Sequence, residues 1–392
     1  MKCVILLSYI LLGKISYQFL IQAENMSNKK HKLLEDLLIF DSHCDTANVF
    51  LDDSSYIVKK DKAHITKEKI KKGGLKAQIF AIWVNPIYSP YRSIKKALLL
   101  YNALDKQLFS KDYATKVTTT KDMHKAIKND KLACWLSIEG GHIIENSTQI
   151  LEFFNSLGLR IMTLTHTKNT DWADSSGDKP KWDGLNKLGR RIVKKMDELN
   201  MIIDVSHSSD KTVEDVFDVT SKPIMASHSC ARALCDIPRN ISDDLIKEIS
   251  DRKGYIGVNF YPGFLKKNIY DQVIKNLEKY EKWFNDKIMG KEDDPDYVNQ
   301  MELELYMKMI KGNDKANIND LVDHIVHISD VGGIDCVGLG SDFDGIPTTP
   351  TDLTDASCYP KLVDGLSSRG FNEEDIRKIM GLNLNNFLKQ FD

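Results

Sequence analysis

The sequence has no pair of cysteines at the C-x-x-C spacing that marks zinc ribbons and redox motifs. Its seven cysteines are scattered between positions 3 and 358, so they do not outline a disulfide framework, and this favours a reducing compartment. Neither positive nor negative charge predominates, because the net charge is −2 and no basic stripe or acidic tail is present. A nucleic-acid partner and a strongly charged protein partner are therefore not indicated.

Long hydrophobic runs are also absent. The apolar run at 3–13 is interrupted by Lys14 and is too short for a membrane-spanning helix. Residues 1–25 fit either a signal peptide cleaved after Ala23 or an extension ahead of a true start at Met26. The first interpretation predicts an exported or periplasmic protein, and the second a cytoplasmic one. No apolar tail ends the sequence, so we expect no GPI anchor.

What the sequence does contain is an alternation of short apolar segments with longer amphipathic ones, repeated eight times. The short segments read as buried parallel strands, and the longer ones, such as 184–200, as helices with one apolar face. This pattern predicts an α/β fold, a (β/α)₈ barrel of the TIM type, in a single domain over 26–392; an open doubly wound sheet is the competing architecture. The predicted strands are residues 37–45, 74–84, 131–138, 159–165, 201–206, 222–227, 254–260 and 334–340.

Three further segments have predictable character. Residues 262–318 are charged and too long for one crossover helix, so we expect an inserted helical hairpin over or beside the barrel mouth. Ser242 is expected to cap the start of a helix. Residues 372–391 space their apolar side chains as one final helix does.

Residues able to bind metals stand at the ends of the predicted strands. In a barrel these ends meet at one rim, where barrel enzymes keep their active sites. Four of these residues are histidines that follow or end different strands, which scattered histidines rarely do. The set comprises Asp41, His43, Asp45, Glu139, His166, His207, His228, Asp342 and Asp344.

The spacing of the first pair sharpens this prediction. Residues two apart share one face of a strand, so His43 and Asp45 point together and Cys44 points away. With a second carboxylate and two further histidines they form a mixed nitrogen and oxygen set, which suits zinc and leaves manganese and iron open. Five protein ligands exceed what one catalytic zinc with an open position takes. They suit two metals bridged by one carboxylate.

Arg239 lies in a loop past the sixth predicted strand, and spacing alone leaves its role open. An arginine there most often makes a salt bridge at a helix start. Its planar guanidinium would also match a substrate carboxylate.

Six motifs, in their order along the chain, resemble those of the membrane (renal-type) dipeptidase family of the amidohydrolase superfamily. The resemblance runs from about residue 37 to the C-terminus. The motifs are DSHCDT (41–46), IEGGHII (138–144), LTHTKNTDWADS (164–175), IDVSHSSDKT (203–212), ASHSCARALCDIPRN (226–240) and GLGSDFDG (338–345).

This resemblance implies a zinc-dependent dipeptidase that hydrolyses the peptide bond through a hydroxide bridging two zinc ions. By position, the implied metal ligands are His43, Asp45, Glu139, His207 and His228, with Glu139 as the bridge.

The resemblance also assigns the remaining roles. His166 would polarise the scissile carbonyl, Arg239 would bind the substrate carboxylate, and Asp342 would transfer protons. Small dipeptides are the implied partners, and a homodimer is one assembly that the family adopts.

Two departures from the family pattern bear on these expectations. Ser42 and Cys44 stand where the family usually has glycine and asparagine, but neither is an implied ligand. The insertion at 262–318 changes the mouth and puts substrate preference in doubt. Two alternatives stay open: another amidohydrolase-superfamily metallohydrolase acting on N-acyl amino acids or cyclic amides, and a catalytically silent binding barrel.

Overall fold

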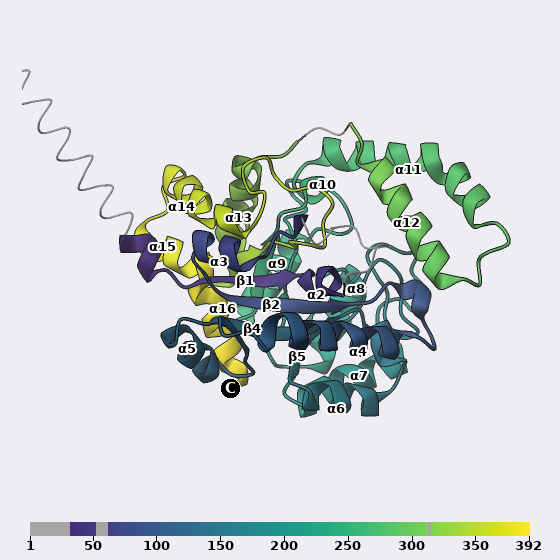
Figure 1. Cartoon of the computed structure of the whole chain (residues 1–392), viewed down its shortest axis with the longest axis horizontal. Helices are drawn as coiled ribbons and strands as arrows, with labels where there is room; N and C mark the ends of the chain where they lie inside the picture. Colours follow the sequence, from purple (N-terminus) through teal and green to yellow (C-terminus); the bar gives the residue numbers. More distant parts are fainter. Residues whose placement is uncertain (1–31, 52–61, 313–314) are drawn as a thin grey trace, which may run out of the picture. The chain divides into compact units, whose positions relative to one another are not determined.

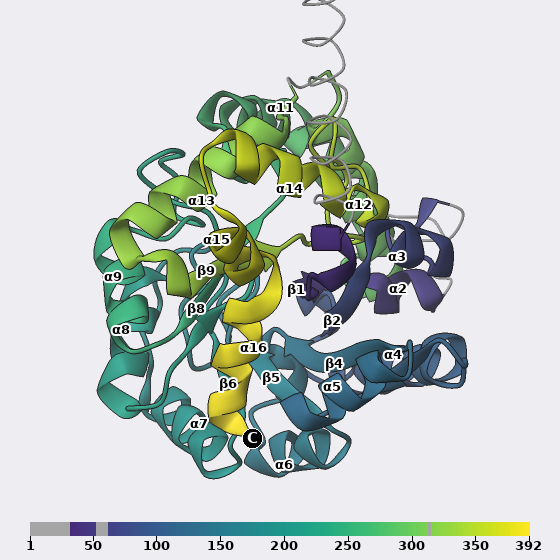
Figure 2. The ribbon, with the colours of Figure 1, turned by 90° about the vertical axis from the view of Figure 1, so that its left-hand side faces the viewer.

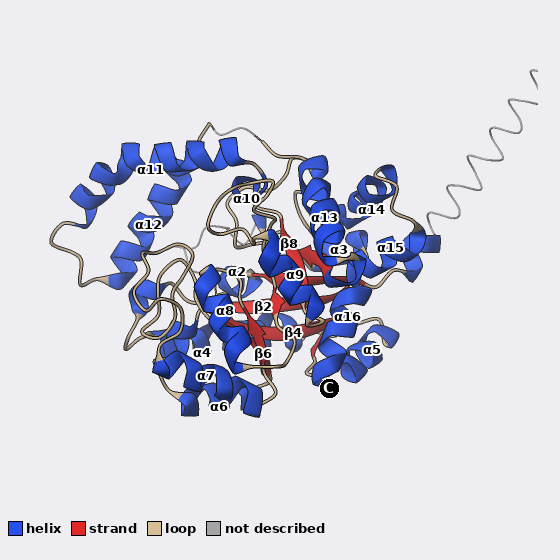
Figure 3. Cartoon of the chain, turned by 180° about the vertical axis from the view of Figure 1, so that it is seen from behind, coloured by secondary structure: helices blue, strands red, loops and turns tan. Residues whose placement is uncertain are grey.

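Eight parallel strands close into a ring in the computed structural model (Figure 2), which describes residues 32–51, 62–312 and 315–392. Figure 3 shows the strands in the interior, behind the helices. The strands pair in the order β2-β1-β9-β8-β7-β6-β5-β4, and pairing of β2 with β4 closes the ring. The closed barrel confirms the predicted fold and excludes the open doubly wound sheet. The strands are β1 (Ile39–Cys44), β2 (Leu75–Trp83), β4 (Leu132–Glu139), β5 (Leu159–Thr163), β6 (Ile202–Asp204), β7 (Met225–Ala226), β8 (Tyr255–Asn259) and β9 (Val337–Gly340).

Each of the eight predicted strands is present with both ends within a few residues of the prediction, and β4 extends one residue beyond it, to Glu139. One further strand, β3 (Ala114–Lys116), pairs with β4 outside the ring. Its three residues are too few to show a hydrophobic period, which explains why the pattern did not predict it. Contacts divide the chain into residues 1–37 and 38–392, and the barrel belongs to the second unit. Both interpretations of residues 1–25 lie outside the described residues.

Helices surround the strands on the outside (Figure 2), because their apolar faces cover the barrel. Ser242 caps α9 by accepting a hydrogen bond from the backbone N–H of Leu245, as predicted. Among the described residues, no helix is both long and apolar enough to cross a membrane. The helices are α2 (Thr46–Phe50), α3 (Lys67–Gly73), α4 (Ser93–Leu104), α5 (Thr120–Lys128), α6 (Thr148–Ser156), α7 (Lys187–Glu198), α8 (Asp210–Val219), α9 (Asp243–Asp251), α13 (Ile318–Gly332) and α14 (Tyr359–Ser368).

The C-terminal segment is not the single helix that we predicted. It consists of α15 (Glu373–Arg377), a π-helical turn and α16 (Asn383–Leu388), with a break at Gly381. A β-carbon on Gly381 would lie 2.1 Å from the carbonyl oxygen of Leu38, so the chain approaches β1 closely there. Beyond the break, Phe387 packs into the core between the strands.

The long insertion forms the expected helical hairpin. After the short α10 (Pro262–Leu265), α11 (Lys267–Ile288) and α12 (Pro295–Met309) pack against each other (Figure 1). The hairpin is attached to the loop after β2, where the Tyr88 hydroxyl donates a 2.6 Å hydrogen bond to Asp296.

Candidate metal centre and active site

The ends of six strands bring the predicted metal and catalytic residues together, although their motifs lie far apart in the sequence. Glu139 is the last residue of β4 and His43 is the second-to-last residue of β1, whereas the others follow β1, β5, β6, β7 and β9. This placement follows from the parallel topology, because the carboxyl ends of all barrel strands share one rim.

Glu139 lies at the centre of this cluster. Its Oε2 atom is 3.4 Å from Nε2 of His43. Its Oε1 atom is 3.4 Å from Nε2 of His207 and 3.5 Å from Nε2 of His228. The two carboxylate oxygens therefore face different histidines, and Glu139 belongs to two of the three groups of side chains close enough to hold a metal ion.

A second carboxylate, Asp45, belongs to the remaining group of three, together with His43 and Asp342. Asp45 Oδ2 is 3.5 Å from His43 Nε2, so the pair shares one strand face as predicted. Asp45 stands at the N-cap of α2, yet its carboxylate caps no backbone N–H. The third group adds Asp342, whose Oδ1 is 3.9 Å from His43 Nε2.

The donor atoms fit divalent cations. His43 Nε2 and Asp45 Oδ1 are buried, and neither has a hydrogen-bond partner in the described part of the chain. Buried polar atoms are normally hydrogen-bonded or coordinate a metal. Imidazole nitrogens with carboxylate oxygens form the set that zinc takes in hydrolases. The residues therefore fit metal ions at this place.

The electrostatics of the cluster point the same way. Burial lowers the pKa values of His207 and His228 well below the usual value for histidine, and the charge of Arg239 adds to both shifts. Both rings are therefore neutral, which is the form that binds a metal. Burial also raises the pKa of Asp45 to about 7, with Glu139 as the next cause. A cation between these carboxylates would offset their repulsion and favour their ionised forms.

A hydrogen-bonded chain of side chains orients His228. The Ser227 hydroxyl donates to Asp204 Oδ2 at 2.6 Å, so its oxygen accepts from Nδ1–H of His228 at 2.7 Å. Thr163 also donates to Asp204, which is buried. This arrangement leaves the Nε2 lone pair of His228 facing Glu139, as in other sites where a carboxylate fixes the tautomer of a metal-binding histidine.

Three residues after the strand ends adopt left-handed backbone conformations. The φ angles are 66° for His207, 60° for Asp342 and 69° for Asp344. Such conformations are uncommon for residues other than glycine, cost about 1–3 kcal/mol each, and cluster at functional sites. The loops thus accept local strain to direct these side chains.

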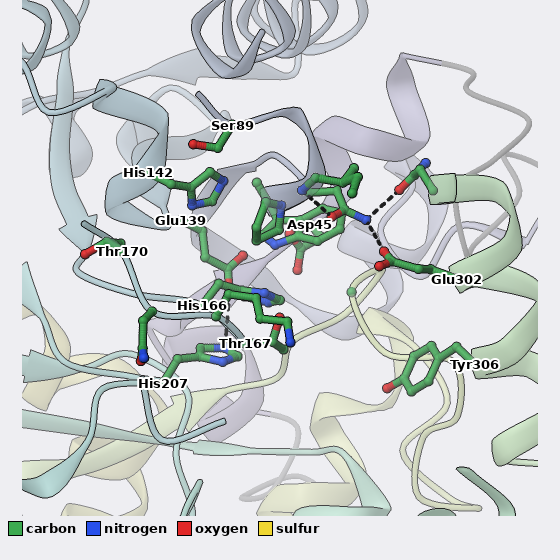
Figure 4. A pocket seen from close by; sticks show the side chains of 18 of the residues that line it. Asp45, Ser89, Glu139, His142, His166, Thr167, Thr170, His207, Glu302 and Tyr306 are labelled. Carbon is green, nitrogen blue, oxygen red and sulfur yellow. Dashed lines mark hydrogen bonds and ion pairs between the residues drawn. The ribbon is translucent and has the colours of Figure 1, made fainter. Parts of the chain in front are cut away.

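A cavity of about 730 Å³ opens above the cluster. Figure 4 shows Asp45, Glu139, His166 and His207 on one side of it. Asp342 also lines the cavity, whereas His43 and His228 stack on each other beneath it, with ring centroids 3.7 Å apart.

His166 has the surroundings of a neutral hydrogen-bond donor. Burial, then the charge of Arg239, lowers its pKa to about 3. Its Nε2 atom is 3.8 Å from Glu139 Oε1, and its ring lies 4.4 Å from that of His207. The side chain therefore lies at the metal cluster and on the cavity wall at once.

Arg239 is half-buried beside the cavity but does not line it. Its guanidinium donates to Ser229 Oγ at 2.9 Å and to the carbonyl of His228 at 2.7 Å. Its Cζ atom lies 5.1 Å from the ring centre of Phe264, which does line the cavity. The proposed contact of Arg239 with a substrate carboxylate stays a prediction.

Sequence reasoning missed the opposite wall of the cavity. Figure 4 shows Glu302 and Tyr306, from α12, facing the predicted residues. No motif marks them, because they belong to the insertion rather than to a strand end. The only available signal was the insertion's predicted position at the mouth.

Comparison with solved structures supports the fold. The chain superposes on the probable dipeptidase PvdM from Pseudomonas aeruginosa with a TM-score of 0.79 and 25% identity, covering 94% of this chain and 98% of that one. A metallo peptidase from Rhodobacter sphaeroides, liganded with a phosphinate mimic of the dipeptide L-Ala-D-Ala, gives a TM-score of 0.73 at 22% identity over 91% and 99% of the two chains.

Comparison with curated sequences gives relatives named as dipeptidases. Dipeptidase tcpJ of Claviceps purpurea is 32% identical over 69% of this chain and 54% of its own length. Human dipeptidase 3 is 27% identical over 83% of this chain and 58% of its own length. The chain thus spans about half to two thirds of these relatives. The profile described as "Membrane dipeptidase (Peptidase family M19)" matches residues 27–392. The chain therefore belongs to the membrane dipeptidase family, peptidase family M19.

Proposed function

We propose that the chain is a zinc-dependent dipeptidase with two zinc ions in its active site. The observation that carries this proposal is the position of Glu139, whose two carboxylate oxygens face separate histidines on the floor of a cavity. The family and the names of the curated relatives support a dipeptide as the substrate.

The ligands divide into two sets around Glu139. His43 and Asp45 would hold one ion and His207 and His228 the other, with Glu139 shared between them. Zinc bound at such sites polarises a carbonyl and makes water a nucleophile near neutral pH.

The remaining polar residues would act on the substrate directly. His166, neutral and on the cavity wall, would donate a hydrogen bond to the oxygen that becomes negative in the transition state. Asp342 would accept the proton of the attacking water and pass it to the leaving amine. Arg239 would bind the C-terminal carboxylate, which restricts the substrate to very short peptides.

A substrate panel tests this function against its nearest alternative. Dipeptides, N-acyl amino acids and cyclic amides are compared by kcat/KM with the zinc-loaded protein. We expect dipeptides to be hydrolysed well above the other classes. A preference for N-acyl amino acids or cyclic amides would replace the proposed activity, and no hydrolysis despite a full zinc content would favour a binding barrel.

Removing the metal is expected to abolish dipeptide hydrolysis and to lower the melting temperature. An ion present at 1,000 times its Kd stabilises the folded state by about 4 kcal/mol, which is lost on chelation. The measurements are metal content, activity and Tm after treatment with 1,10-phenanthroline and after zinc is returned. A metal-free protein with full activity would contradict the scheme.

Arg239→Ala is expected to raise KM for a dipeptide far more than for the corresponding dipeptide amide. Hydrogen bonds to charged groups contribute about 1.5–3 kcal/mol, which corresponds to roughly 10- to 100-fold in kcat/KM. Because Arg239 also donates to the carbonyl of His228, zinc content is measured in parallel. Equal losses for the acid and the amide would argue against carboxylate binding.

A further inference from the structure

The cavity extends from the metal cluster to α12 of the insertion, so part of its wall is not made by strand ends. Its volume of about 730 Å³ is well within the range of sites that enclose whole ligands. The residues that α12 contributes are Asn299, Glu302, Leu303, Leu305, Tyr306 and Met309.

Glu302 is held in place on this wall. Asn85, from the loop after β2, donates from Nδ2 to Glu302 Oε2 and to Asn299 Oδ1, both at 2.7 Å. Asn85 is itself oriented, because its Oδ1 accepts from the backbone N–H of Ile87 at 3.0 Å. Among the residues that the structure describes, none donates to Oε1 of Glu302. A half-buried, positioned carboxylate with one open oxygen is suited to a cationic group.

The charges around the cavity favour a cation as well. Outside the metal cluster and its histidines, the charged residues on the wall are Glu145, Asp171, Glu302 and Lys168. Glu145 and Asp171 already accept hydrogen bonds from the chain at the other side of the cavity. Lys168 is exposed. Glu302 is thus the carboxylate that α12 places on the wall opposite the predicted metal ligands.

The position of Glu302 relative to Arg239 indicates which end of a substrate it meets. Asn85 follows β2 and Arg239 follows β7, and these strands are four places apart in either direction around the eight-stranded ring. A dipeptide with its carboxylate at Arg239 therefore directs its N-terminal residue across the mouth toward Glu302.

Aromatic and aliphatic side chains lie beside Glu302. Tyr306 lies one helical turn further along α12 and lines the cavity together with Tyr261, whose ring centroid is 4.9 Å from that of Phe264. Leu303 and Met309 also line the wall. Long basic side chains bury their methylene stems on such surfaces while the charged end remains paired.

We propose that Glu302, held by Asn85, is the charged end of a subsite for a lysine or arginine side chain on the N-terminal residue of the dipeptide. This inference rests on the proposed dipeptidase function, and it names a substrate preference that the insertion adds to the barrel.

The test compares lysyl-alanine with norleucyl-alanine, which has nearly the same side chain without the charge. We expect the wild type to have a higher kcat/KM for lysyl-alanine than for norleucyl-alanine. Glu302→Gln should lower the ratio of these two kcat/KM values roughly 10- to 100-fold. Glu302→Lys should shift the preference to glutamyl-alanine. Glu304→Gln, an exposed position on the same helix that does not line the cavity, should keep the wild-type ratio.

The outcomes separate the subsite from the activity. Equal loss for lysyl- and norleucyl-alanine in Glu302→Gln would mean that Glu302 acts on the α-amino group, and the side-chain subsite would be overturned. A wild type that hydrolyses both peptides equally well also refutes the subsite while leaving the dipeptidase function intact. A zinc-loaded wild type that hydrolyses no dipeptide refutes both.

Discussion

Replacing Glu139 with alanine is expected to reduce the bound metal below two ions per chain and to abolish dipeptide hydrolysis. One oxygen of Glu139 faces His43 and the other faces His207 and His228, so its loss would remove a ligand from both proposed ion positions. The loss of activity should exceed the ~10²- to 10³-fold loss that follows removal of one hydrogen bond to the transition state. Metal content by mass spectrometry and kcat/KM for a dipeptide are the measurements.

Two further variants make this prediction specific. Glu139→Gln keeps the size of the side chain but lacks the charge, so it should also bind fewer ions, and zinc should raise its Tm less than that of the wild type. Glu145→Gln removes a carboxylate from the same cavity wall, but Glu145 accepts a bond from the backbone of Ile94 and should not affect the metal. Two ions per chain in Glu139→Ala would contradict the bridging role.

The barrel and the grouping of the predicted ligands at its rim could be predicted because both depend on short-range patterns. Period-two spacing placed His43 and Asp45 on one strand face, and parallel topology placed strand ends on one rim. The eight strands of the ring were accordingly located to within a few residues. Local spacing was sufficient here because every predicted ligand stands within three residues of the end of a strand.

The parts that the sequence did not predict depend on contacts between distant segments. Gly381 breaks the last helix because β1 lies against it, which no helical period reveals. The support of His228 by Asp204 requires β6 and β7 to be neighbours. The pairing of Asn85 with Glu302 joins a barrel loop to the insertion, and neither residue belongs to a motif.

The direction of the Arg239 side chain also could not be predicted from the sequence. The motif predicted its loop correctly, but the side chain is bonded to Ser229 and to the backbone of His228 instead of lying on the cavity wall. A residue's place in the chain determines its neighbourhood, whereas the direction of a long side chain is determined by the partners available in the fold.

Asp342→Asn is expected to lower kcat by about 10²- to 10⁴-fold, the contribution of general acid–base catalysis, while zinc content stays at the wild-type level. Asp342 lines the cavity beside the cluster, and Asn259 Nδ2 donates to its Oδ2 at 2.9 Å. Burial raises its pKa to about 7, which suits proton transfer near neutral pH. Asparagine keeps the size and tolerates the left-handed backbone, but its amide cannot take up a proton.

Asp344→Asn is the matched control, since Asp344 lies two residues further in the same loop and also has a left-handed backbone. Its carboxylate accepts 2.6 Å hydrogen bonds from the Thr46 hydroxyl and the backbone N–H of His64, and it does not line the cavity. We therefore expect Asp344→Asn to lower Tm and to leave kcat of the folded protein near the wild-type value. Similar losses of kcat in both variants would mean that the loop, and not the Asp342 carboxylate, is what turnover requires.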